Sequence, residues 1–297
     1  MRWGHLQFLW FPLMETTYQH ALITGGSSGI GFALAQALAQ EGTSLGLIAR
    51  DREKLASAEE SLTTLLRKEN QAIETLSCNI TDYRNLQGEL ENYIQRNGIP
   101  DLVINSAGVT HPGYFQELDV EIFHEMMEVN FFGTLYVTKC LVPHMISKGS
   151  GTIVNISSQA GFLGVFGYSA YGASKYAIRG FSDVLRAEMK PLGVKIAIVF
   201  PPDTQTPQLD YEDALKPPET KAIAGNANVL TAEHVAQSIL KGLRKGQYVI
   251  IPGLEGKIFY RLVGFLGNLT YPVMDWLVRK AQKEKDLADN TGNQESL

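Results

Sequence analysis

Short, unbroken apolar runs recur along the chain, each separated from the next by a longer amphipathic stretch. The strand-length runs cover residues 21–24, 44–49, 73–78, 101–105, 152–157 and 195–200. Because they are continuous rather than alternating with polar residues, they indicate strands buried on both faces, as in a parallel sheet. Alternation of strand and helix requires crossover connections, so we predict an α/β fold with a doubly wound parallel sheet, the Rossmann fold.

The helices expected between the first strands cover residues 30–40, 51–68 and 83–96. We predict an N-terminal extension (1–17), one NADP-binding Rossmann catalytic domain (18–252), a C-terminal amphipathic helical appendage (253–286) and a disordered C-terminus (287–297). The first thirteen residues are apolar, but they are too few to span a bilayer and lack a small-residue cleavage site. Whether the chain starts at Met1 or Met14 stays open, and we favour Met14.

Bulk properties narrow the class of protein. Of the 297 residues, 44% are hydrophobic, which is enough to fill one large core. The formal net charge of −5 provides no general attraction for nucleic acid. Two cysteines, Cys78 and Cys140, make no disulfide framework. We expect no nucleic-acid partner and no metal.

A glycine-rich turn, TGGSSGIG, follows the first strand. Glycines here let the backbone approach a pyrophosphate, and the following helix N-terminus offers free N–H groups and a positive dipole end. The spacing is G-x-x-x-G-x-G rather than the common G-x-G-x-x-G. We expect this turn to bind a dinucleotide through Thr24, Gly25, Ser27, Ser28, Gly29, Ile30 and Gly31.

The same turn also satisfies G-x-S-x-G, the nucleophile elbow of serine hydrolases. An elbow serine needs an acid and a histidine later in the chain. The one late histidine, His234, lies in a polar helical stretch, and an elbow usually follows several strands rather than the first. We therefore favour dinucleotide binding over hydrolysis.

Basic residues end the second strand, where an NAD enzyme would place an acid for the ribose 2′-hydroxyl. Arg50 offers a planar cation for a 2′-phosphate, and Lys54 lies one turn further on. The alternative is that both residues are simply solvated on a surface helix. We predict NADP(H) as the cofactor.

Two further strand ends offer cofactor contacts. Asn79, with Ile80, follows the third strand, where an amide can reach the adenine edge. The segment after the fourth strand, Asn105-Ser-Ala107-Gly108, has small residues that leave room for the nicotinamide ribose. Asn79 also begins a glycosylation sequon, but a strand end inside a nucleotide cleft argues against that use.

A phenol and an ammonium lie four residues apart in Tyr171-Gly-Ala-Ser-Lys175, and positions i and i+4 share a helix face. Reducing a carbonyl requires a proton at its oxygen, and a free phenol with a pKa near 10 is a weak partner at neutral pH. A neighbouring Lys⁺ favours the phenolate and lowers that pKa. An ordinary surface pair is the alternative, and Tyr168 is a rival phenol without a lysine four residues later.

Ser158 and Asn130 complete the candidate chemistry. Ser158 follows the fifth strand, so its hydroxyl can donate to a substrate oxygen at the strand ends. Asn130 lies in a helical stretch, where asparagine is unfavourable, and we expect it to hold a water that links Lys175 to solvent. A satisfied helix kink is the alternative.

Together these motifs resemble the short-chain dehydrogenase/reductase family over residues 18–252. The resemblance implies a catalytic tetrad of Asn130, Ser158, Tyr171 and Lys175, with the last two also binding cofactor, and further cofactor contacts at Pro201 and Thr204. Two positions depart from the family pattern. Asn79 stands where many members carry Asp, and Pro201-Pro202 stands where Pro-Gly is usual.

The segments FPPDTQTP, KPPET and SSQAGFLGVFGYSAYGASKYAIRG resemble one branch of this family, whose members reduce the ketone of a long-chain sphingoid base with NADPH. The resemblance implies a lipid-like ketone as substrate. A steroid, an acyl ketone or a xenobiotic ketone stays open, as does a non-catalytic NADP-binding relative.

The stretch 258–278 is apolar but interrupted by Arg261 and Asp275, which argues against a spanning helix. With the basic residues that follow, it suits a helix pair lying on a membrane surface, so we expect peripheral contact through residues 255–285 on the cytoplasmic face. A subunit contact or a lid over the core is the alternative. A homodimer or homotetramer, paired through the helices that hold Asn130 and Tyr171, also stays open.

Overall fold

The structure, a computed structural model, describes residues 18–225 and 228–294. The predicted N-terminal extension lies outside the described residues. A seven-stranded, all-parallel sheet in the order β3-β2-β1-β4-β5-β6-β9 forms the centre of the molecule. Its strands are β1 (His20–Thr24), β2 (Ser44–Ala49), β3 (Ile73–Ser77), β4 (Leu102–Asn105), β5 (Gly151–Ile156), β6 (Val194–Val199) and β9 (Val249–Ile250). The doubly wound parallel sheet is confirmed, with one short edge strand that the apolar runs did not indicate.

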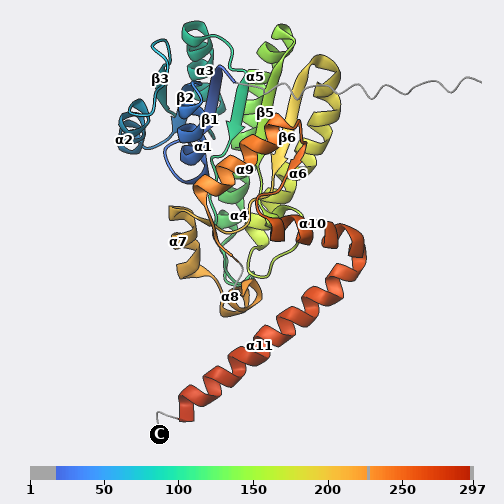
Figure 1. The fold of residues 1–297 in the computed structure, drawn as a ribbon. Coiled ribbons are helices and arrows are strands. Elements are labelled where there is room, and N and C mark those ends of the chain that lie inside the picture. The colour runs from blue at the N-terminus through green and yellow to red at the C-terminus, as the bar shows by residue number, and fades with distance from the viewer. Residues whose placement is uncertain (1–17, 226–227, 295–297) are drawn as a thin grey trace, which may run out of the picture.

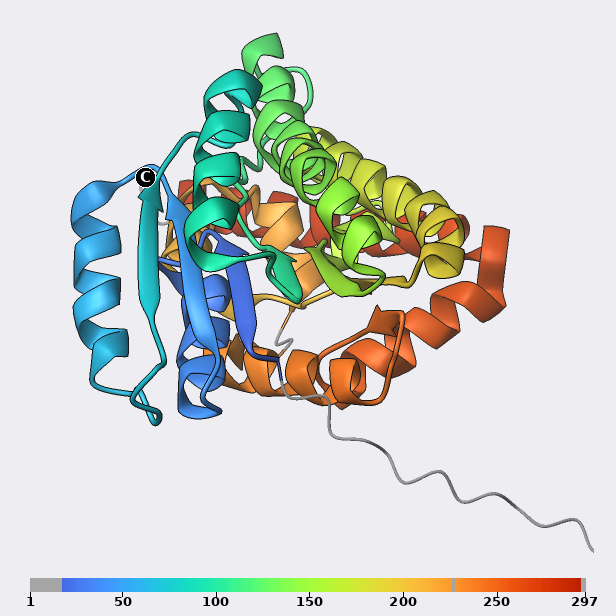
Figure 2. The ribbon, with the colours of Figure 1, turned by 90° about the horizontal axis from the view of Figure 1, so that it is seen from above.

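Helices cover both faces of the sheet (Figures 1 and 2). One face is covered by α1 (Gly29–Gln40), α2 (Arg52–Thr63) and α9 (Ala232–Arg244). The other is covered by α3 (Tyr83–Asn97), α5 (Gly133–Lys148) and α6 (Ser169–Met189). Each side has its own buried cluster of aliphatic residues, which explains why the strands read as continuous apolar runs.

Helix α2 ends at Thr63, five residues earlier than predicted. The chain after it turns back toward the sheet, where Gln71 is buried. Its side-chain amide donates to the carbonyls of Ala39 and Thr43, both at 2.8 Å. These hydrogen bonds satisfy backbone groups at the end of α1, and a longer α2 would remove Gln71 from them.

Three smaller helices and a two-stranded sheet lie beyond the carboxyl ends of the central strands. They are α4 (Val120–Met126), α7 (Pro207–Leu215), α8 (Pro218–Ala224), β7 (Thr204–Gln205) and β8 (Leu230–Thr231). The strand order reverses between β1 and β4, which is the topological switch point where open α/β sheets bind ligands. This end of the sheet is therefore the place to look for a site.

The C-terminal region consists of α10 (Leu254–Leu266) and the long α11 (Thr270–Gln294), which Figure 1 shows running past α8. We expected the helical appendage to end at residue 286, but the helix continues to Gln294. Of the added residues, only Leu287, Ala288 and Gln294 are good helix formers, so intrinsic propensity does not explain the extension. Within the described part of the chain, no helix is both long and apolar enough to cross a membrane.

Candidate active site

The glycine turn after β1 has contacts that only glycine permits. Gly25 has a φ of +66°, and a Cβ there would lie 2.9 Å from the Cα of Ala107. A Cβ on Gly31 would overlap the carbonyl oxygen of Gly25. These close approaches let β1, α1 and the loop after β4 meet around one concave backbone surface.

The start of α1 is suited to an anion. Gly29 has a φ of +55° and begins the helix, and Ser28 before it makes no side-chain cap. The first turn also holds no acidic residue. N–H groups of this turn therefore have neither a side-chain acceptor nor a nearby negative charge, which fits a pyrophosphate at the helix N-terminus.

Two of the predicted cofactor residues have inward-facing side chains. Thr24 is buried, and its hydroxyl oxygen accepts from the backbone N–H groups of Ser106 and Ala107, both at 3.1 Å. The amide of buried Asn105 donates to Asn155 at 2.9 Å and to Thr138 at 3.2 Å. Both side chains thus hold strand ends together, while the buried Oδ1 of Asn105 has no hydrogen-bond partner among the described residues.

The residues expected at the 2′-phosphate and the adenine lie at the ends of β2 and β3. Arg50 is exposed, whereas Lys54 forms an exposed ion pair with Asp51 at 3.7 Å. The exposed Asn79 accepts from the N–H of Thr81 at 3.2 Å, in a local turn. Ile80 is buried, so only the small accessible part of its side chain could contact an adenine. Arg50 is thus the cation available for a phosphate.

After β6, Pro201 and Thr204 shape the chain as it leaves the sheet. The carbonyl of Pro201 accepts from the N–H of Gln159 at 3.2 Å, and buried Thr204 donates to the carbonyl of Pro202 at 2.8 Å. The methyl group of Thr206 lies 3.2 Å from the place of a Cβ on Gly29. Sequence reasoning missed Thr206, the side chain that closes over the glycine turn.

Tyr171 and Lys175 lie on one face of α6 and are both buried, at 8% and 5% exposure. The ammonium Nζ lies 5.5 Å from the centre of the Tyr171 ring. It donates to the carbonyl of Ile156, the last residue of β5, at 3.2 Å. Gly108 lies beside the same ammonium, since a Cβ there would be 3.4 Å from Nζ. The phenol and the amine therefore lie together at the end of β5.

Ser158 begins a short 3₁₀ turn directly after β5. Its hydroxyl oxygen accepts from the N–H of Ala160 at 3.2 Å. Ser158 also lowers the pKa of Tyr171, against the larger effect of burial. A carbonyl oxygen placed between them would meet two donors.

Asn130 is fully buried in a π-helical turn (Met127–Phe132) between α4 and α5. Its carbonyl oxygen accepts from the N–H of Val109 at 2.8 Å, and its amide donates to the carbonyl of Val109 at 3.0 Å and to Ser174 at 2.9 Å. Single π-turns in helices often mark functional sites. The side chain is engaged in joining the loop after β4 to α6, which favours positioning over the water relay that we expected.

The expected lowering of the pKa of Tyr171 is not found. Burial raises its pKa first, and the carboxylate of Glu212 raises it further, against the opposing effect of Ser158. Burial lowers the pKa of Lys175 to about 8, and Glu212 opposes that shift. Both groups are buried, and desolvation, which favours the neutral form of each, is the largest cause of both pKa shifts.

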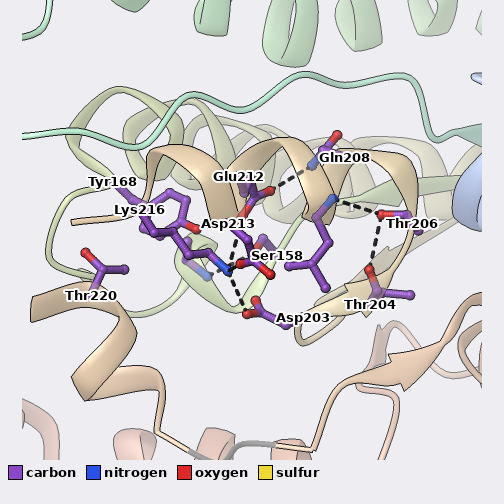
Figure 3. A network of polar contacts seen from close by, with 12 residues as sticks. Ser158, Tyr168, Asp203, Thr204, Thr206, Gln208, Glu212, Asp213, Lys216 and Thr220 are labelled. Atoms are coloured by element: carbon purple, nitrogen blue, oxygen red, sulfur yellow. Dashed lines mark hydrogen bonds and ion pairs between the residues drawn. The ribbon is translucent and has the colours of Figure 1, made fainter. Parts of the chain in front are cut away.

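Sequence reasoning also missed a partly buried polar network beside this site (Figure 3). The phenol of Tyr168 donates to Glu212 of α7 at 2.7 Å, and burial together with this carboxylate raises the pKa of Tyr168. The ammonium of Lys216 lies 2.8 Å from Asp213, 3.1 Å from Asp203 and 4.0 Å from Glu212. The rival phenol is therefore bound to a carboxylate, while Tyr171 is paired with the lysine.

The hydrolase alternative gains no support. Among the described residues, the ring of His234 makes no hydrogen bond to Ser27 or to a carboxylate, and only its backbone N–H is bonded, to Thr231 at 3.2 Å. Nor does the described part of the chain contain a cluster of three or more His, Cys, Asp or Glu side chains able to hold a metal ion.

Comparison with known proteins agrees with this geometry. The family model for short chain dehydrogenase matches residues 19–215. The chain is 36% identical over 252 residues to a 3-dehydrosphinganine reductase of Danio rerio, covering 84% of this chain and 76% of that protein. It is 39% identical over 254 residues to a 3-ketodihydrosphingosine reductase of Dictyostelium discoideum, covering 81% and 76%.

Among solved structures, the fold matches a short-chain dehydrogenase from Sphingobium yanoikuyae in complex with NADPH. The TM-score is 0.71 at 26% sequence identity, and the match covers 86% of this chain and 95% of the other. The likeness therefore extends over most of this chain and nearly all of the other.

Proposed function

Since the chain belongs to the short-chain dehydrogenase/reductase family, we propose that it reduces the ketone of a long-chain sphingoid base, 3-dehydrosphinganine, to sphinganine with NADPH. The observation that carries this proposal is the similarity to several reductases named for that substrate, combined with the buried Tyr171–Lys175 pair at the strand ends. The reaction belongs to sphingolipid biosynthesis.

The cofactor site fits NADPH on the chain's own geometry. Glycine positions that a Cβ would block, an uncapped helix start without acidic residues, and exposed Arg50 suit a pyrophosphate and a 2′-phosphate. When bound, NADPH supplies the hydride that the carbonyl carbon accepts. Pro201 and Thr204 border this site, and Asn79 and Ile80 border its adenine end.

The remaining steps fall to side chains of this chain. Ser158 orients the ketone oxygen, and Tyr171 donates the proton that the oxygen needs as the hydride arrives. The positive charge of Lys175, beside the ring, favours the phenolate that is left behind. Asn130 holds the loop after β4 against α6 through its hydrogen bonds to Val109 and Ser174.

A substrate panel tests this proposal. Oxidation of NADPH is followed with 3-dehydrosphinganine, a steroid ketone and a small xenobiotic ketone, and kcat/KM should be largest for the sphingoid base. A higher kcat/KM for the steroid would assign the chain to another branch of the family. No NADPH oxidation with any ketone would instead support the non-catalytic alternative.

We also infer that the C-terminal helices bind the surface of a membrane, on its cytoplasmic face. Tyr260 and Val263 of α10 pack against a core cluster that includes Phe162 and Phe200. The other side of α10 and the start of α11 expose large apolar side chains, namely Leu254, Ile258, Leu262, Phe265, Leu269, Tyr271 and Trp276. Phe265 is 88% exposed. One face of α10 thus covers part of the core, as a lid would. The other face offers an apolar strip flanked by basic residues, which suits a helix lying at a membrane interface.

Cosedimentation with anionic phospholipid vesicles tests the tail. The double variant Leu262→Glu and Phe265→Glu should lose most vesicle binding, because two charges would enter the apolar strip. Val184→Glu, at an exposed apolar position of α6, is the matched control and should bind like the unaltered protein. Equal binding by the double variant would rule out this strip as the membrane contact.

A further inference from the structure

A carboxylate lies one aromatic ring away from the phenol that would protonate the substrate. Glu212 of α7 is 7% exposed, and its Oε2 accepts from the Tyr168 hydroxyl at 2.7 Å. The rings of Tyr168 and Tyr171 have centres 5.6 Å apart. Glu212 therefore lies close to the candidate site, and Figure 3 shows it near Tyr168 and Ser158.

This carboxylate acts on the reacting groups. Its charge raises the pKa of both Tyr171 and Lys175, and Asp203 adds to the effect on Tyr171. A negative charge so placed opposes the loss of a proton by Tyr171, which is the step that reduction requires. A cation bound between Glu212 and Tyr171 would offset that opposition.

Of the three acids near Lys216, only Glu212 is buried, since the side chains of Asp203 and Asp213 are 46% and 59% exposed. Asp203, Glu212 and Asp213 share the ammonium of Lys216, which lies closest to Asp213 and Asp203 and most distant from Glu212, at 4.0 Å. The other buried ammonium nearby, Lys175, donates to the carbonyl of Ile156 instead. Buried carboxylates are normally paired with a cation, whereas Glu212 is held by neutral donors, the Tyr168 hydroxyl and the Gln208 amide at 3.2 Å, with an ammonium only at 4.0 Å.

We propose that Glu212 recognises a protonated amine on the carbon next to the ketone of the substrate. The inference rests on the proposed function, because a sphingoid ketone carries its amine at that carbon. With the ketone oxygen between Ser158 and Tyr171, an adjacent ammonium can turn toward α7 and meet Glu212. The enzyme would then select amino ketones over plain long-chain ketones through one charge-assisted contact.

Two substrates of equal chain length test the proposal: 3-dehydrosphinganine and its analogue with hydrogen in place of the amine. The unaltered protein should favour the amine-bearing ketone. Glu212→Gln should lower kcat/KM for that ketone by about tenfold to a hundredfold, the size expected for losing one hydrogen bond to a charged group. Its kcat/KM for the amine-free analogue should be retained or increased.

Asp213→Asn is the matched control, because Asp213 lies on the same helix and pairs with the same lysine, but its side chain is 59% exposed. It should leave the preference between the two ketones unchanged. An equal loss on both ketones in Glu212→Gln would show that Glu212 only holds α7 in place through Tyr168, and would overturn the inference.

The unaltered protein separates this inference from the function on which it rests. If it reduces both long-chain ketones equally well, amine recognition is wrong although ketone reduction stands. If it reduces neither but does reduce a steroid ketone, the proposed function itself has failed.

Discussion

Two regions border the candidate site, and they differ in whether backbone or side-chain contacts hold them in place. The glycine turn (24–31) is shaped by the backbone, through close approaches such as that of Gly25 to Ala107. The segment after β6 (202–225) is held by side chains, through Tyr168–Glu212 and Lys216–Asp203. The first region offers N–H groups that suit a pyrophosphate, whereas the second places a buried carboxylate, Glu212, near the candidate site.

The difference explains what each region reveals in the sequence. A backbone approach demands glycine, and glycines at a strand-to-helix turn are visible as a motif. Glu212 and Lys216, in contrast, are four residues apart, at the end of a short helix and directly after it, a spacing that ordinarily indicates a solvated surface pair. Glu212 is bound by Tyr168, which lies more than forty positions earlier in the chain. No local sequence pattern therefore indicates that the pair is buried.

Replacing Tyr171 by Phe should have the largest effect, because this side chain lies where the two regions meet. We expect kcat to fall by about 10²- to 10⁴-fold, the usual contribution of a general acid. Since the ring is kept, NADPH binding, measured by the quenching of protein fluorescence, should remain as in the unaltered protein. Tyr168→Phe is the control phenol. If Tyr168→Phe abolished turnover and Tyr171→Phe did not, the two roles would be reversed.

On the backbone side, Gly31→Ala should cost about 1–3 kcal/mol of unfolding free energy, because its Cβ overlaps the Gly25 carbonyl and the turn must shift. The measurement is urea denaturation. Gly88→Ala, on α3 with no atom within 4 Å of the new Cβ, should be neutral or stabilising by up to about 1 kcal/mol. Equal stability of the two variants would mean that the turn is not a close-packed backbone structure.

The same contrast sets how much of the molecule the sequence predicts. Six of the seven central strands and the Tyr171–Lys175 pair follow from periodicity and spacing. The inward turn of Asn105 does not, because its partners Thr138 and Asn155 are brought near only by the fold. The direction of the Tyr171 pKa was wrong for a related reason, since burial is a property of the assembled core rather than of the motif.

Arg50→Ala sharpens the cofactor side of the comparison. If Arg50 binds a 2′-phosphate, the ratio of kcat/KM for NADPH to that for NADH should fall by about tenfold or more, through loss of a charge-assisted contact. Lys54→Ala should change the ratio less, because Lys54 is paired with Asp51. An unchanged ratio in Arg50→Ala would mean that this arginine is a solvated surface residue that does not contact the 2′-phosphate.

The smallest expected effect is on the pH dependence of kcat/KM, which involves both Lys175 and Glu212. Burial lowers the pKa of Lys175 from 10.5 to about 8, so its positive charge is present below that pH and is lost as the pH rises through it. Because the charge favours the Tyr171 phenolate, kcat/KM should decline by about threefold between pH 7.5 and 8.5.

Glu212 raises the pKa of Lys175, so Glu212→Gln should move this decline in kcat/KM to lower pH. The measurement uses the amine-free ketone, to exclude titration of the substrate. Asp213→Asn should leave it in place, and a decline unmoved in both variants would show that the carboxylate does not act on the lysine.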